Sequence, residues 1–183
     1  EPKLVGNQRN IVVSDQSGKS NIISRLKTIG IEVNNEDPKI KKILNEVKDR
    51  EFIGYSYDGA DASFELLARR IIGEIPTYLT ISEYDVSVKK NNKGKIISIA
   101  KAHILVDGNE VVCEGEGNGP VNALDNAIRD NVDKVGKYSK YLKDLKLVDY
   151  KVRILNTGTE AVTRVSIEST DSKGKNWFTI GVS

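Results

Sequence analysis

The sequence is poor in the residues that most often form disulfides, metal sites and membrane spans. Cys113 is the only cysteine among 183 residues, so an internal disulfide is impossible and a reducing, cytoplasmic compartment is expected. Its apolar neighbours suit a small core residue. His103 is the only histidine, which is weak ground for a general base or a metal ligand. No run approaches the ~18 apolar residues of a membrane span, and "EPKLVGNQRN" at the start contains no apolar signal core.

An excess of charge of one sign is also missing. The formal net charge is +2, and 30% charged with 38% hydrophobic residues is the balance of a soluble globular protein. Nucleic-acid and membrane partners need clustered basic charge, so we expect neither. The length suits one sizeable domain or two small ones. The chain does not start with methionine, and we treat it as part of a longer protein.

Up to Pro76 the apolar residues repeat with the period of helices. Asp37 is a candidate helix cap with Pro38 at the first helical position, and Gly73 is placed to end a helix. We therefore expect a helical linker subdomain over residues 1–75. Its helical segments are "SNIISRLKTIG", "NEDPKIKKILNEVKDREFIG" and "DGADASFELLARRIIG".

From residue 76 onward, apolar and polar residues alternate as they do in strands. Three strand-like segments and a helix over 76–137 precede three more strand-like segments over 138–183. The pairs "YDVSV" with "YKVRI" and "GEGNG" with "TIGVS" indicate an internal repeat of roughly 65 residues. The predicted fold class is therefore α+β, in which the linker precedes a domain of two βββα units, 76–183. The second unit lacks its final helix, which we expect after Ser183. The expected apolar face of the first helix is Val121, Leu124, Ile128, Val132 and Val135.

The glycine-rich stretch "GEGNGPVNAL" leads into that helix and allows two interpretations. The free N–H groups at a helix start favour an anion, and glycines let a ligand approach the backbone closely. Alternatively, the stretch is a plain strand-to-helix turn with Gly119 as the cap and Pro120 at the first helical position. We expect Gly119 to need a φ angle that glycine tolerates best.

Two further clusters are open to a functional and a structural interpretation. Asp58, Asp61 and Glu65 share one helical face, where they could bind a metal or form a solvated first turn. The run "KVGKYSKYLKDLK" carries Tyr138 and Tyr141, and it could touch RNA or form a solvated linker. No nucleophile, base and acid fall into one arrangement. We therefore predict no catalytic and no metal-binding residue in this chain, which is not a complete enzyme.

Three motifs together resemble the C-terminal half of the citramalate synthase and 2-isopropylmalate synthase family, across essentially the whole chain. They are "LVGNQRNIVVSDQSGKSNI", "YSYDGADASFELLARR" and "EGEGNGPVNALDNAI". The core "GADASFELL" is most similar to the citramalate synthase branch. Leucine-pathway members carry a histidine just before the "SG" of "SGK", where this chain has Gln16. This departure also favours citramalate synthase.

The resemblance implies a longer enzyme of which this chain is the regulatory part. Family members carry a TIM barrel that uses a divalent metal to condense acetyl-CoA with a 2-oxo acid. This chain would thus need no cofactor and have no condensing activity by itself. The helical linker leads to a regulatory domain that forms a homodimer and binds isoleucine or leucine for feedback inhibition. The alternatives are a stand-alone amino-acid-sensing module and a purely structural dimerisation module.

The resemblance also implies which residues bind the effector. Backbone N–H groups of the helix start suit its carboxylate, and the apolar residues suit its branched side chain. Tyr150 and Ile154 point the same way if their segment is a strand. The implied effector-binding residues are Gly117, Asn118, Gly119, Pro120, Val121, Asn122, Leu147, Tyr150, Ile154, Gly181, Val182 and Ser183.

Overall fold

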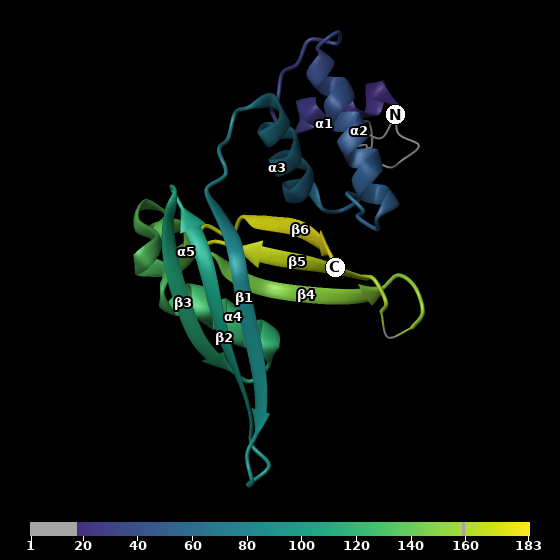
Figure 1. Cartoon of the computed structure of the whole chain (residues 1–183). Helices are drawn as coiled ribbons and strands as arrows, with labels where there is room; N and C mark the ends of the chain where they lie inside the picture. The colour runs from purple at the N-terminus through teal and green to yellow at the C-terminus, as the bar shows by residue number, and fades with distance from the viewer. Residues whose placement is uncertain (1–17, 159) are drawn as a thin grey trace. The chain divides into compact units, whose positions relative to one another are not determined.

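The computed structural model describes residues 18–158 and 160–183. Within this range three helices come first, followed by two three-stranded antiparallel sheets (Figure 1). The α+β class predicted from the sequence is confirmed. Gln16, which the resemblance above uses to favour one branch of the family, lies outside the described residues.

The three helices begin and end at residues that act locally. They are α1 (Lys19–Thr28), α2 (Pro38–Phe52) and α3 (Asp61–Ile72). Asp37 caps α2, because its carboxylate accepts the backbone N–H of Lys39 at 2.8 Å, and Pro38 takes the first helical position. Gly73 ends α3 in the left-handed conformation at φ 82°. The predicted cap, proline and terminating glycine are thus confirmed.

The helices share one apolar core, and a buried arginine lies beside it. Arg25 of α1 donates hydrogen bonds to the carbonyl of Tyr57, at 3.1 Å, and to the carboxylate of Asp61 in α3. Its guanidinium also lies 5.2 Å from the ring centre of Phe64. The arginine therefore connects α1 to the start of α3. The buried core residues are Ile22, Leu26, Ile31, Ile40, Ile43, Val47, Tyr57, Phe64, Leu67 and Ala68.

The first sheet consists of β1 (Leu79–Lys90), β2 (Ile96–Val106) and β3 (Asn109–Gly117), in that order. Asp107 and Gly108 connect β2 to β3 with positive φ angles of 49° and 81°, as a two-residue hairpin turn requires. The side chains of alternate β2 residues point to one face, where they are buried. This core contains Ala100, Ala102, Ile104, Val106, Cys113, Ala123 and Ala127.

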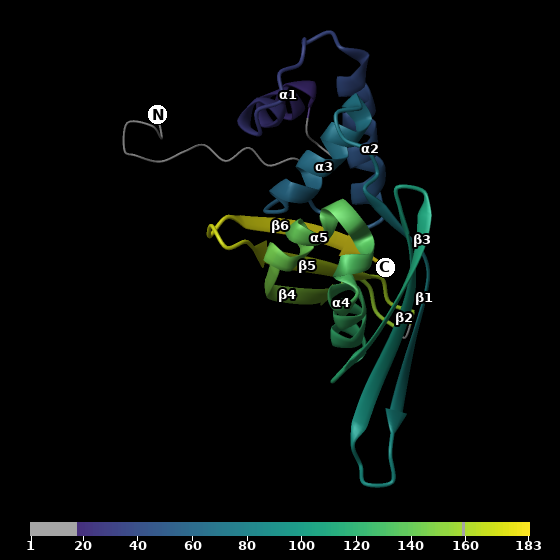
Figure 2. The ribbon, with the colours of Figure 1, turned by 90° about the vertical axis from the view of Figure 1, so that its left-hand side faces the viewer.

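Helix α4 (Pro120–Asp130) lies very close to the backbone of this sheet (Figure 2). A Cβ atom on Gly115 would lie 2.3 Å from the backbone nitrogen of Ala127, and one on Gly117 would lie 2.4 Å from that of Ala123. Glycine on the strand and alanine on the helix therefore allow the two backbones to approach. This pairing of small residues positions the start of α4 above the end of β3.

The helix differs from the predicted one in length and in orientation. It ends at Asp130 rather than near residue 137, and a 3₁₀ segment (Val132–Tyr138) and α5 (Ser139–Asp144) follow. Gly136 interrupts the helical geometry with φ 58° and ψ −123°. The side chain expected on the inner face at Val121 is 55% exposed, because the two small alanines occupy the close contact instead. The predicted positions of the Val132 and Val135 side chains fall outside the described part of the chain.

The second sheet consists of β4 (Lys146–Ile154), β5 (Thr163–Thr170) and β6 (Asn176–Val182), in that order. It contacts α3, where Ser63 Oγ accepts the backbone N–H of Ile180 at 2.9 Å. None of the described residues from 146 to 183 is buried. Within the described part of the chain, this sheet thus has no core of its own.

Contacts along the chain divide it into two compact units. One contains the residues up to Pro76 together with Leu147–Ser183, and the other contains Thr77–Lys146. The division into a linker over 1–75 and a regulatory domain over 76–183 remains a prediction.

Candidate functional site

The start of α4 presents free backbone donors. Gly119 is the cap and Pro120 the first helical residue. The side chain of Asn122 accepts the backbone N–H of Asn118 at 3.1 Å. The N–H groups of Val121 and Asn122 have no acceptor within 18–158 and 160–183. These two donors at the positive end of an 11-residue helix suit a carboxylate.

The glycines of this loop have different roles from those expected. Gly119 has φ −161°, which is extended backbone, and a Cβ there would meet no atom within 4 Å. The expectation that Gly119 needs a glycine-only φ is therefore wrong. Gly117 is the sterically required glycine, because Ala123 fills the space that its side chain would need. The strand-to-helix turn thus depends on close packing at Gly117 and on the carbonyl of Gly119, which accepts the N–H of Ala123 at 2.9 Å.

The predicted residues of β4 form part of an exposed apolar strip. Tyr150 is 45% and Ile154 65% exposed, and their spacing in the strand places them on one face. Leu147 is separated from Tyr150 by an odd number of positions, so alternation places it on the opposite face. Of the three effector-binding residues predicted in β4, Tyr150 and Ile154 thus share a face and Leu147 does not. Val148 and Val152 alternate with them in the same strip.

The last predicted residues lie at the end of β6. Gly181 pairs with Val165, and a Cβ on Gly181 would meet no atom within 4 Å. The backbone of Ser183 exchanges two hydrogen bonds with Thr163, at 2.8 and 3.0 Å. Its N–H is therefore engaged in the sheet rather than available to a ligand. Gly117–Asn122 belong to the unit Thr77–Lys146, whereas Leu147, Tyr150, Ile154 and Gly181–Ser183 belong to the other unit.

Two of the three acidic residues before and within α3 pair with arginines. Asp61 pairs with Arg25, and Glu65 accepts from Arg69 Nε at 2.8 Å. No group of three His, Cys, Asp or Glu residues that could hold a metal ion occurs in the part of the chain that the structure describes. Asp61 and Glu65 therefore stabilise the helices through their arginine partners.

The sole histidine and cysteine have ordinary structural surroundings. His103 Nδ1 lies 2.8 Å from Glu110 Oε1 on the exposed face of the first sheet. Cys113 lies in the core beneath α4, and its burial raises the pKa of the thiol. His103 thus lies at the surface and Cys113 in the core, as a structural role for each would require.

The tyrosine-containing basic run forms a cavity that the sequence did not reveal. Asp107 accepts hydrogen bonds from Lys137 and from the Tyr138 hydroxyl, and these hold the pKa of Asp107 below its usual value. Tyr78 lines the same cavity, although it lies near the start of the unit in sequence. A spacing of three between Tyr138 and Tyr141 was the local signal, but nothing in the sequence connects them to Tyr78.

The described helices include none that is both long and apolar enough to cross a membrane.

The elements and their exposed apolar strip define an α+β protein with a sheet face suited to association. Comparison with protein families is more specific, because residues 58–183 match the family described as the LeuA allosteric (dimerisation) domain. The chain belongs to this family. The resemblance predicted from the three sequence motifs is thus confirmed.

Curated relatives agree with the family. The chain is 43% identical to the (R)-citramalate synthase of Aquifex aeolicus and 41% identical to that of Geobacter sulfurreducens, in each case over all of this chain and 34% of the relative. It is 28% identical to a probable 2-isopropylmalate synthase of Methanopyrus kandleri, over 94% of this chain and 32% of the relative. The chain thus spans about a third of the length of these relatives.

Proposed function

We propose that this chain is the regulatory region of an acetyl-CoA-dependent acyltransferase of the citramalate synthase or 2-isopropylmalate synthase kind. In this proposal it binds isoleucine or leucine as a feedback inhibitor and holds two copies together. The observation that carries the proposal is the match of residues 58–183 to an allosteric dimerisation family. The synthase names belong to relatives that are 38–43% identical over the whole chain. The expected cytoplasmic location remains a prediction.

The condensation reaction itself is assigned to residues outside this chain. The described residues contain no cluster of ligands for a divalent metal, and the chain spans about a third of the length of its relatives. We infer that acetyl-CoA, the metal and the 2-oxo acid are bound by a barrel elsewhere in the longer protein. This chain would contribute regulation and association.

Two parts of the chain have the chemistry that an amino-acid effector needs. The free N–H groups of Val121 and Asn122 suit its carboxylate. The exposed strip at Tyr150 and Ile154 suits its branched side chain, which gains from the removal of apolar surface from water. The two parts belong to different units of the chain, so each needs a test of its own.

Asn122→Asp tests the proposed carboxylate site and keeps the hydrogen bond that residue 122 accepts from the N–H of Asn118. The aspartate can still accept the N–H of Asn118, and its negative charge is favourable at a helix start. The same charge repels the effector's carboxylate, so calorimetric titration with isoleucine and leucine should show binding weakened by about three- to fivefold. Asn109→Asp, an exposed residue at the start of β3, is the matched control.

The comparison between the two variants decides the outcome. The proposal requires that Asn109→Asp leaves the dissociation constant unchanged while Asn122→Asp raises it, with no loss of thermal stability. If neither amino acid binds to the polypeptide that contains this chain, the chain is a purely structural dimerisation module. Equal constants for both variants would show that the helix start does not bind the effector.

A further inference from the structure

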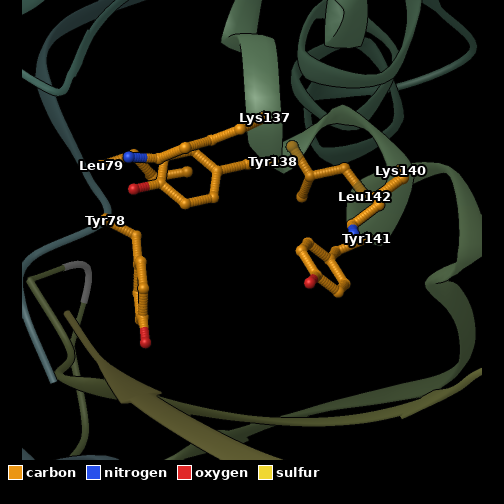
Figure 3. A pocket seen from close by; sticks show the side chains of 7 residues that line it. All are labelled: Tyr78, Leu79, Lys137, Tyr138, Lys140, Tyr141 and Leu142. Carbon is orange, nitrogen blue, oxygen red and sulfur yellow. The ribbon is translucent and has the colours of Figure 1, made fainter. Parts of the chain in front are cut away.

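A cavity of about 610 Å³ lies within the unit Thr77–Lys146 (Figure 3). Tyr78 and Tyr141 lie on opposite sides of the cavity, and Tyr138 lies between them. The volume falls within the roughly 300–1,000 Å³ of small-molecule sites. The cavity shares no residue with the proposed effector site. Its lining is Tyr78, Leu79, Lys137, Tyr138, Lys140, Tyr141 and Leu142.

One wall of the cavity is held in place by polar contacts. The hydroxyl of Tyr138 donates to Asp107 Oδ1 at 2.9 Å, and the ring of Tyr78 packs edge-on at 5.6 Å between ring centres. The ammonium of Lys137 lies 2.9 Å from Asp107 Oδ2 and 5.0 Å from the centre of the Tyr138 ring. A ligand therefore meets an aromatic wall that needs little further ordering, which favours binding.

The opposite side of the cavity carries the ammonium group of Lys140. Lys140 Nζ lies 4.7 Å from the ring centre of Tyr141 and has no carboxylate partner among residues 18–158 and 160–183. Lys137 and Lys143, by contrast, are each paired with an aspartate. The Tyr141 side chain is exposed, and its hydroxyl makes no hydrogen bond within the same described range. An anionic group can therefore be bound at this rim beside an apolar surface.

We propose that this cavity binds a small organic acid with a flat or branched apolar body. Its anionic group lies at the Lys140 ammonium, and its body packs against Tyr78, Tyr138 and Tyr141. A free amino acid is disfavoured, because its own ammonium group would face two lysines while Asp107 is already engaged. A nucleic-acid strand is less suitable, since it needs several unpaired cations along its path.

The test uses 2-naphthoate as the probe and backbone amide NMR of the ¹⁵N-labelled chain as the readout. Saturable chemical-shift changes should concentrate at residues 137–142 and at Tyr78 and Leu79. Lys140→Gln should raise the dissociation constant by about three- to fivefold, and neutral 2-naphthalenemethanol should bind more weakly by a similar factor. Lys93→Gln in the β1–β2 turn removes the same charge outside the cavity and should change nothing.

A second pair of variants tests the aromatic wall. Tyr141→Ala should weaken 2-naphthoate binding, whereas Tyr84→Ala should not, because the two tyrosines are each 64% exposed but only Tyr141 lines the cavity. Shifts that avoid residues 137–142, or an unchanged constant for both Lys140→Gln and Tyr141→Ala, would overturn the proposal. So would an oligouridylate that shifts these amides when 2-naphthoate does not.

Discussion

At the scale of the residue, Tyr57 should make the stability of the helices fall at alkaline pH. Its ring is buried between Tyr55 and Phe64, and burial raises the pKa of its hydroxyl from 10.0 to about 12. The folded chain thus holds this proton more tightly than the unfolded chain does. The protonated hydroxyl therefore contributes its full share to the free energy of unfolding below the unfolded pKa of 10.0, and this share is lost as the pH rises towards 12.

Tyr57→Phe should remove this alkaline loss. Urea unfolding of the wild type should show an extra fall of at most about 3 kcal/mol between about pH 10 and pH 12, since one pKa unit corresponds to about 1.4 kcal/mol. The variant lacks only this hydroxyl, so the difference between the free energies of unfolding of the wild type and the variant is the relevant quantity. A difference that does not change with pH would contradict the assignment to Tyr57.

At the scale of the element, the docking of α4 depends on small residues. Gly117→Ala would place a Cβ 2.4 Å from the backbone nitrogen and 2.8 Å from the Cα of Ala123, atoms that cannot rotate away. We expect the free energy of unfolding to fall by about 1–3 kcal/mol, as for overpacking in a core. Gly119→Ala meets open space, so only the poorer capping by alanine counts, and the loss should stay below about 1 kcal/mol.

Urea denaturation of the two variants checks this contrast. Both glycines lie in the proposed effector loop, so the pair also separates a loss of folding from a loss of binding. Similar stabilities for Gly117→Ala and Gly119→Ala would show that α4 can move away from β3 at no cost.

Element ends could be predicted from the sequence because their causes are local. Each residue that marks a helix end lies within a few residues of that end. These residues are Asp37 with Pro38, Gly73, and Gly119 with Pro120. The inner face of α4 was not predictable in the same way. It depends on Gly115 and Gly117, which lie in a strand and admit alanine rather than larger residues.

The candidate site could be predicted only in part, for the same reason. The helix start and the strip of alternating apolar residues in β4 are local patterns, and the structure shows both. Leu147 does not belong to the strip, because alternation turns it to the other face. The cavity was not predictable, because Tyr78 and Tyr138 are brought together only by the fold of the first sheet.

At the scale of the whole molecule, the second sheet needs a cover. Val148, Tyr150, Val152 and Ile154 are between 45% and 65% exposed, and they share one face of β4. Exposed apolar strips of this kind mark surfaces of association, and the chain belongs to a family described by dimerisation. A second copy that covers this face gives the symmetric homodimer that we propose.

Val152→Asp tests this assembly. A charge in the centre of the strip should convert the wild-type dimer to a monomer in sedimentation velocity, because an unpaired buried charge is costly. Arg153→Asp, one position along the strand, points to the opposite face and should leave the dimer intact. A wild type that sediments as a monomer, or a dimer that persists in Val152→Asp, would place the interface elsewhere.

The most direct test of the regulatory assignment is the release of free CoA by the longer polypeptide that we propose contains this chain. With acetyl-CoA, a divalent metal and pyruvate or 2-oxoisovalerate, we expect turnover that isoleucine or leucine inhibits. Tyr150→Ala should weaken this inhibition and leave uninhibited turnover nearly intact, because only the coupling between sites changes. Tyr84→Ala should leave both the turnover and its inhibition unchanged. Turnover that neither amino acid affects, or inhibition that is unchanged in Tyr150→Ala, would contradict this account.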